Sequence, residues 1–174
     1  TAKPCAACAC DVPVPDAAPT AAAAGPQLSA EQDKRVADAA AQRVVAAVRG
    51  QAMDQPIEAV LGDAAGIEVY GAFVTLKRGE QLRSCCGFLG QSVPLSVALD
   101  HAAVRAAKDD PRFPPISPTE LDFLSMDVWL LWGLQPVAAR GQDRIAAVTI
   151  GKHGLQIARG QSRGLLLPGV AVEH

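Results

Sequence analysis

The sequence lacks both a long apolar run and an excess of positive charge. Its longest apolar candidate, residues 128–134, is far shorter than the roughly 20 apolar residues that cross a bilayer. Sixteen Lys and Arg stand against eighteen Asp and Glu, which gives a net charge of −2. Capture of nucleic acid needs clustered positive charge that displaces counterions. We therefore predict neither a membrane-spanning segment nor a nucleic-acid partner.

Several familiar chemical motifs are also missing. The chain contains no phosphate-binding glycine loop, no paired metal-ligating histidines and no serine elbow. Its cysteines are odd in number and fall into two groups, which makes a poor disulfide framework and favours a reducing, cytoplasmic setting. The pattern Cys5-x-x-Cys8-x-Cys10 is an incomplete metal site in a segment without a fold to hold it. We therefore predict no bound metal and no other cofactor.

Composition divides the chain near residue 28. Residues 1–27 are mostly Ala and Pro and contain no aromatic side chain. Such a segment buries too little apolar surface to offset the entropy lost on ordering, so we predict a disordered tail or linker there. Residues 28–174 are long enough for one hydrophobic core and are predicted to form one domain. The chain starts at Thr1 without a secretory signal pattern, which suggests a cropped or processed start.

Two amphipathic helices are predicted from apolar residues at helical spacing. Ser29 and Gln32 fit a capping box at the start of the first helix, and Gly50 suits its end. Pro94 suits the first turn of the second helix, and Pro111 is expected to end it because the residue before a proline avoids helical geometry. The apolar faces comprise Val36, Ala40, Val44, Ala47 and Val48 in the first helix, and Leu95, Leu99, Ala102, Ala103 and Ala106 in the second.

The other periodic segments are rich in β-forming residues and predict strands. Two of them flank a turn at Arg78-Gly79-Glu80 and predict a β-hairpin. The Pro-rich connection after the second helix is expected to be stiff, with Phe113 anchored in the core. Because helices stand among hairpins without regular βα alternation, the pattern indicates an α+β fold. Strands are predicted at 72–77, 82–89, 124–131, 146–150 and 155–158, a short helical piece at 57–61, and a turn at 160–164 that leads into apolar residues 165–167.

Alternation along the strand at 82–89 separates its two cysteines. Cys86 shares a face with apolar neighbours and is expected in the core, whereas Cys85 shares the other face with Arg83 and Gly87. A guanidinium about 7 Å away along the strand favours the thiolate, the nucleophilic form of cysteine. Gly87 would leave room for a ligand on that face. The alternative is that Cys85 is a small buried residue and Arg83 a surface charge.

Two further segments could carry functional groups. Residues 151–155 are predicted to form a tight turn between two strands, where His153 could carry protons near neutral pH and Lys152 could bind an anion. The alternative is a polar hairpin turn whose glycines adopt positive φ. The segment Asp109–Pro115 could also bind a ligand, because loops carry functional groups. Its alternative is a helix stop followed by a stiff loop with an internal Asp–Arg pair.

Four of these segments resemble, in order, the signatures of the AMMECR-type domain family. Leu82-Arg83-Ser84-Cys85-Cys86-Gly87 matches the family's Leu-Arg-Gly-Cys-Ile-Gly, and residues 110–115 match its Asp-Pro-Arg-Phe-Pro-Pro. Residues 151–155 and 164–168 match two later signatures, so the resemblance runs from about Ser29 to His174. Ser84 replaces a glycine, Gly169 replaces a common glutamine, and the chain stops before the final helical segment usual in such domains.

The family's biochemical activity is not established, so the resemblance implies a fold and a site more than a reaction. It implies a two-lobed α+β fold with mixed or antiparallel sheets, flanking helices and a cleft. The cleft would lie near the strand at 82–89, which carries the first signature and which we call the hallmark strand. Bacterial relatives are often encoded with, or fused to, a Memo-like protein and a radical SAM protein, which implies such partners. The site that we predict has Cys85 and His153 as catalytic residues and Arg83, Ser84, Gly87 and Lys152 as substrate-binding residues.

Two functions are consistent with this pattern. The first is a cysteine-centred enzyme, or enzyme subunit, that acts on a small or anionic substrate. In it, Cys85 is the nucleophile, Arg83 lowers the thiol's pKa or binds a substrate anion, and His153 carries the proton. The second is a non-catalytic binding or scaffold module that uses the same cleft. The sequence contains no complete catalytic set, so both hypotheses are carried forward.

Overall fold

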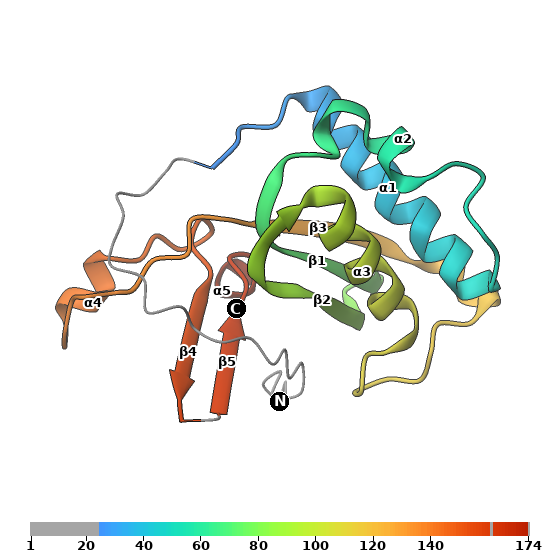
Figure 1. The fold of residues 1–174 in the computed structure, drawn as a ribbon. Coiled ribbons are helices and arrows are strands. Elements are labelled where there is room, and N and C mark those ends of the chain that lie inside the picture. Colours follow the sequence, from blue (N-terminus) through green and yellow to red (C-terminus); the bar gives the residue numbers. More distant parts are fainter. Residues whose placement is uncertain (1–24, 161, 174) are drawn as a thin grey trace.

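The computed structural model describes residues 25–160 and 162–173, which fold into helices and two antiparallel sheets (Figure 1). The larger sheet has three strands in the order β2-β1-β3, and the smaller sheet pairs β4 with β5. These elements confirm the α+β class. Most of the predicted tail lies outside the described residues, as do Cys5, Cys8 and Cys10. In chain order the elements are α1 (Ala30–Arg49), α2 (Ile57–Leu61), η1 (Gly62–Ala64), β1 (Glu68–Arg78), β2 (Gln81–Pro94), α3 (Leu95–Lys108), η2 (Pro118–Phe123), β3 (Ser125–Leu131), α4 (Asp143–Ala146), β4 (Leu155–Arg159), β5 (Ser162–Leu166) and α5 (Val170–Glu173).

Helix α1 begins and ends where its capping residues predict. The Ser29 hydroxyl accepts a hydrogen bond from the Gln32 N–H at 3.2 Å, and the Gln32 side chain accepts one from the Ser29 N–H at 2.9 Å. Gly50 follows the last helical residue with a φ of 66°, a left-handed conformation that glycine adopts without strain. The predicted apolar stripe is buried at Val36, Ala40, Val44 and Ala47 and half-buried at Val48.

Helix α3 packs beside α1, and the two helices cover one face of the three-stranded sheet (Figure 1). The helix starts directly after Pro94, as predicted, and ends at Lys108, shortly before Pro111. None of the described helices is both long and apolar enough to cross a bilayer. The predicted apolar face of α3 is at most 1% exposed and consists of Leu95, Leu99, Ala102, Ala103 and Ala106.

Strands β1 and β2 form the predicted hairpin and are longer than the predicted strands. The loop between them contains Gly79, whose φ of 58° suits the first position of a tight type II′ turn. Strand β3 pairs with the other side of β1. As a result β1 is the central strand of this sheet, and β2 is an edge strand.

The two faces of the three-stranded sheet carry different side chains. Every second residue points toward α1 and α3 and packs in the core, as the predicted alternation requires. These helix-facing residues include Ala72, Val74 and Leu76 on β1, Cys86 on β2, and Met126, Val128 and Leu130 on β3. We call the opposite side the outer face. It carries Phe73 and Thr75 on β1, Cys85 and Gly87 on β2, and Asp127 and Trp129 on β3, whereas Arg83 lies at an irregularity of the β1–β2 pairing.

The predicted strand at 146–150 is wrong. Residues 143–146 form the one-turn helix α4, and residues 147–150 belong to neither a helix nor a strand. Ile150 is 68% exposed, and in the described part of the chain no strand lies beside this stretch to pair its backbone. β-forming side chains do not make a strand without such a partner. The turn predicted at 160–164 is also shorter, because β5 already begins at Ser162.

The segment after β5 packs onto the outer face. Gly169 lies so close to Trp129 that a Cβ atom on it would come within 2.4 Å of the indole ring. The neighbouring Leu167 and Pro168 are buried. A glutamine at position 169 would therefore require the Trp129 ring to move.

Candidate functional site

Cys85 lies half-buried on the outer face, whereas Cys86 beside it is fully buried against the helices. The prediction that Cys86 belongs to the core is confirmed. Thr75 is the partner of Cys85 on β1, and its hydroxyl donates a hydrogen bond to the Cys85 sulfur at 3.3 Å. The Cys85 side chain therefore has a polar neighbour and is not sealed among apolar groups.

The main chain of Cys85 is held by two side chains from the loop after α3. Its N–H donates to Asp110 Oδ2 at 2.8 Å, and its C=O accepts from Arg112 Nη2 at 3.2 Å. Arg112 also donates to both carboxylate oxygens of Asp110, at 2.9 and 2.7 Å. We call this pair the Asp110–Arg112 fork. It confirms the predicted internal Asp–Arg pair, and it takes the place of a neighbouring strand beside the free edge of β2.

Asp110 remains ionised in this position although its side chain is only 3% exposed. Burial by itself would raise its pKa. The hydrogen bonds from the Arg112 side chain and from the N–H groups of Cys85 and Arg112 outweigh burial and lower the pKa to about 2. The fork therefore places one negative and one positive charge beside Cys85, with no net charge.

Arg83 does not face Cys85 as a free cation. Its Nε and Nη2 donate to the two carboxylate oxygens of Glu120 at 2.7 and 3.1 Å. Nη1 and Nη2 also donate to the carbonyls of Pro114 and Pro115, at 3.0 and 3.2 Å. The hydrogen bond from Arg83, joined by one from the Ser117 N–H, lowers the pKa of Glu120 to about 2. Arg83 thus fastens the loop to β2, which disfavours its expected role as an anion ligand.

Phe113 is not the core anchor that was predicted. Its ring lies near two guanidinium groups, 5.9 Å from the Arg83 Cζ and 5.5 Å from the Arg112 Cζ. This arrangement allows favourable cation–π contacts at the surface of the loop. Ile116, which is 5% exposed, is the residue of this loop that enters the core.

Gly87 leaves no room for a ligand, contrary to the expectation from sequence. A Cβ atom on it would come within 2.3 Å of the Ala72 carbonyl oxygen and 2.5 Å of the Phe73 ring. The space beside Gly87 is therefore filled by β1. Its own carbonyl accepts a hydrogen bond from Arg105 at 3.0 Å. Packing alone requires glycine here.

Ser84 lies on the helix-facing side of β2 and is 1% exposed. Its hydroxyl donates to the Ala106 carbonyl at 2.7 Å and lies 3.4 Å from Asp110 Oδ2. The side chain therefore points away from the outer face and ties β2 to α3. This placement does not favour a substrate contact by Ser84.

Lys152 and His153 are exposed in a turn that precedes β4. The Thr149 N–H donates to His153 Nδ1 at 3.1 Å, and the His153 N–H donates to the Thr149 carbonyl at 2.9 Å. Gly151 has the expected positive φ, of 80°. Among the described residues the hydrogen bonds of His153 stay within this turn. The structure does not bring Lys152 or His153 into contact with Cys85.

Sequence reasoning missed two neighbours of the hallmark strand. Thr75 was not singled out because the pairing register of β1 and β2 cannot be read from alternation alone. Glu120 carried a readable signal, since Ser117 and Glu120 fit a capping box and the Ser117 N–H donates to Glu120 Oε2 at 2.8 Å. That signal predicts the start of η2 and not the pairing with Arg83. In the described residues no group of three or more His, Cys, Asp and Glu side chains is arranged to hold a metal ion.

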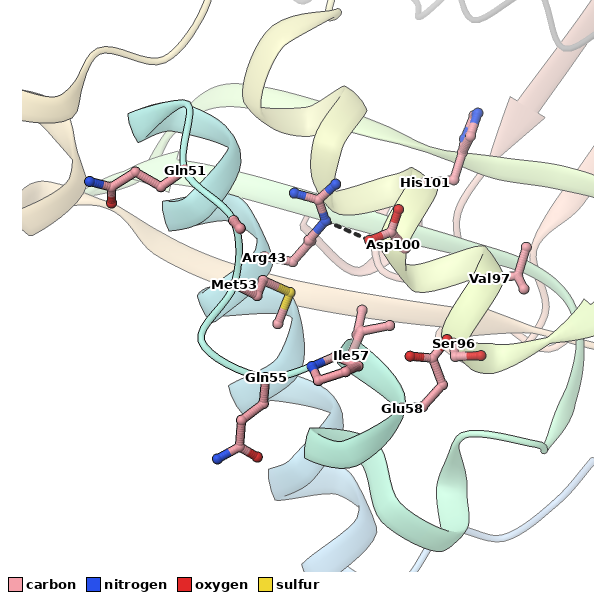
Figure 2. A pocket seen from close by; sticks show the side chains of 12 residues that line it. Arg43, Gln51, Met53, Gln55, Ile57, Glu58, Ser96, Val97, Asp100 and His101 are labelled. Atoms are coloured by element: carbon pink, nitrogen blue, oxygen red, sulfur yellow. Dashed lines mark hydrogen bonds and ion pairs between the residues drawn. The ribbon is translucent and has the colours of Figure 1, made fainter.

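A separate pocket of about 710 Å³ opens on the helical side of the molecule (Figure 2). Arg43 of α1 and Asp100 of α3 form an ion pair on one wall, and residues 51–53 and 55–58 form another. Met53 and Ile57 add apolar surface to it. Cys85 is not among its lining residues, so this pocket is distinct from the outer face.

A family model described as AMMECR1 matches residues 27–174, which include all four signatures. The chain belongs to the AMMECR1 family. Uncharacterized protein PH0010 from Pyrococcus horikoshii, a solved structure, is similar to this AMMECR1 chain with a TM-score of 0.74 and 30% identity. That similarity covers 84% of this chain and 73% of PH0010.

Archaeal proteins are also similar to this AMMECR1 chain. One from Aeropyrum pernix is 43% identical over 107 residues, which are 59% of this chain and 46% of that protein. One from Methanothermobacter thermautotrophicus is 43% identical over 104 residues, which are 59% of this chain and 54% of that protein. The chain spans about half the length of these curated relatives. These similarities establish the AMMECR1 family and leave its activity open.

Proposed function

We propose that this AMMECR1-family protein is a binding module whose recognition site is centred on Cys85 on the outer face. The observation that carries this proposal is that the charged side chains of the signature segments at 82–87 and 110–115 are all bonded within the protein. Arg83 is bonded to Glu120, and Asp110 is bonded to Arg112. These four residues build a rigid frame around Cys85 and are not poised to act on a substrate.

Catalysis by a cysteine nucleophile requires further functional groups around the thiol. A general base must come within hydrogen-bond reach of the thiol proton, and a further group must orient that base. Asp110 and Glu120 are both held as ionised partners of arginines. His153 is bonded within its own turn. A recognition role needs only a fixed surface, which the frame supplies.

The partners implied by the family resemblance are a Memo-like protein and a radical SAM protein. We propose that one of them docks at the outer face, in a cleft between the three-stranded sheet and the β4–β5 unit. Binding would be measured with three forms of the chain: the parent, Cys85→Ala, and the parent alkylated at Cys85. All three would carry serine at Cys5, Cys8 and Cys10.

A binding module predicts that Cys85→Ala binds within about threefold of the parent, because a small side chain replaces another on the same surface. Alkylation adds bulk at the centre of the site and should weaken binding by about tenfold or more, which corresponds to about 1.4 kcal/mol. Binding that is unchanged by alkylation would show that Cys85 lies outside the recognition site.

A cysteine-centred enzyme is the second candidate, and the contact between Thr75 and Cys85 favours it. A hydroxyl that donates to sulfur stabilises negative charge on it, and Cys85 is half-buried and not sealed. The test is the rate of Cys85 alkylation by iodoacetamide as a function of pH. A Cys85 that reacts like an unperturbed thiol over the whole pH range would contradict the nucleophile role.

A further inference from the structure

The main chain at Cys85 is held unusually for an edge strand. Edge strands normally leave their outward N–H and C=O groups to solvent or to another chain. At Cys85 both groups are bonded to side chains, the N–H to Asp110 and the C=O to Arg112. Asp110 is almost fully buried, so its bond to the Cys85 N–H is shielded from competing water.

This hold also determines where the thiol lies. The N–H and C=O of Cys85 point away from β1, so the Thr75–Cys85 pair exchanges no main-chain hydrogen bonds. In such a pair the side chains stand closest together. The contact of 3.3 Å between the Thr75 hydroxyl and the Cys85 sulfur follows from this geometry. Any rotation of the strand at Cys85 would change that contact.

We propose that Asp110 and Arg112 set the reactivity of the Cys85 thiol through their opposite charges, which the fork holds beside the Cys85 main chain. The fork holds the sulfur against Thr75, and its two opposite charges cancel beside the strand. This inference rests on the second candidate function, the cysteine-centred enzyme, in taking the Cys85 thiol as the functional group.

The two members of the fork have opposite charges, and this separates an effect of their charges on the thiol from simple support of the strand. Asp110→Asn loosens the strand and leaves the positive charge of Arg112 uncompensated, which favours the thiolate. Arg112→Gln also loosens the strand but leaves the negative charge of Asp110, which disfavours the thiolate. The other charged groups along β2 are Arg105 of α3, which donates to the Gly87 carbonyl, and the Arg83–Glu120 and Lys77–Asp127 pairs, and they are the same in both variants.

The experiment measures iodoacetamide alkylation of Cys85 and Cys86 separately, by fragment-ion mass spectrometry, across a range of pH. Asp110→Asn should move the midpoint of the Cys85 profile down by about one pH unit, and Arg112→Gln should move it up by a similar amount. Below the midpoint, a shift of one unit changes the rate about tenfold. Cys86 reports on general opening of the fold because it is fully buried. Asp109→Asn, an exposed neighbour, is the matched control and should leave the profile unchanged.

The inference is overturned if both variants move the midpoint in the same direction, or if neither moves it. It is also overturned if the alkylation rate of Cys86 rises together with that of Cys85, since general unfolding exposes both thiols. If Asp110→Asn does not fold, Arg112→Gln and Arg112→Lys carry the test, because Lys retains the charge and must keep the midpoint near that of the parent. Loss of the proposed partner binding would leave these outcomes unaffected, so the two proposals fail separately.

Discussion

Arg83 and Glu120 form a two-point ion pair that joins the edge strand β2 to the loop after α3. The distances are 2.7 Å from Nε and 3.1 Å from Nη2 to the two carboxylate oxygens. Both side chains are largely buried, at 15% and 23% exposure. The arginine of the hallmark motif therefore supports the loop that carries the Asp110–Arg112 fork, and its contribution to the site is indirect.

Removal of the Glu120 charge should destabilise the protein. Glu120→Gln loses the charge-assisted bonds to Arg83 and leaves a partly buried guanidinium without its counter-charge. We expect the free energy of unfolding to fall by about 2 kcal/mol. Urea unfolding would measure this, with the exposed turn residue Glu80→Gln as a control that changes stability by less than about 0.5 kcal/mol. Equal effects of the two substitutions would contradict the role assigned to the pair.

Acid should weaken the protein through Asp110 and Glu120. Their pKa values are lowered to about 2 from ordinary values of 3.8 and 4.5. A carboxylate with a lowered pKa stabilises the fold fully above its ordinary pKa, and this contribution is lost as the pH falls toward the lowered value. The free energy of unfolding should therefore decrease as the pH falls from about 4.5 to about 2.

This acid sensitivity can be assigned to the two carboxyl groups. Urea midpoints would be compared for the parent and for the double variant Asp110→Asn/Glu120→Gln at neutral and acidic pH. At neutral pH the double variant should have a smaller free energy of unfolding than the parent. Between about pH 4.5 and 2 it should lose less of that free energy than the parent does. If both proteins lose the same amount over that range, other carboxyl groups are responsible.

A methyl group at position 87 should disrupt the hairpin. In Gly87→Ala the new Cβ would lie 2.3 Å from a main-chain oxygen of β1 and 2.5 Å from the Phe73 ring. We expect a loss of about 3 kcal/mol in the free energy of unfolding, at the upper end of overpacking effects. Gly66→Ala is the control, since a Cβ there meets no atom within 4 Å. Similar melting temperatures for the two variants would argue against close packing at Gly87.

A side chain at position 169 should displace Trp129. Gly169→Gln would place a Cβ atom 2.4 Å from the indole ring, so the ring has to turn away and become more exposed to water. The expected result is a red shift of the Trp129 fluorescence, measured with Trp132 replaced by Phe to remove the second indole. Gly66→Gln should leave the emission unchanged. An unshifted spectrum in Gly169→Gln would show that the segment after β5 does not rest on Trp129.

The regular elements of the core could be predicted from local patterns. Ser29 and Gly50 marked the ends of α1 because capping depends on groups only a few residues apart. Alternation assigned Cys86 to the core because neighbouring residues of a strand point to opposite faces. The strand predicted at 146–150 is wrong for a related reason, since its β-forming residues have no strand to pair with in the described part of the chain.

The surroundings of Cys85 could not be predicted in this way. Glu120 lies 37 residues from Arg83, and Asp110 lies 25 residues from Cys85. Which of them meet depends on the path of the loop after α3 and on the register of β1 with β2. The same register filled the space beside Gly87 with Phe73.

The sequence by itself thus determined the helices, the hairpin and the separation of the two cysteines, because each depends on the period of a local element. Only the tertiary structure decided what surrounds Cys85. Charged side chains pair with whichever partner the fold brings within reach, and burial fixes that choice. Arg83 therefore pairs with Glu120, and the main chain of Cys85 is held by Asp110 and Arg112.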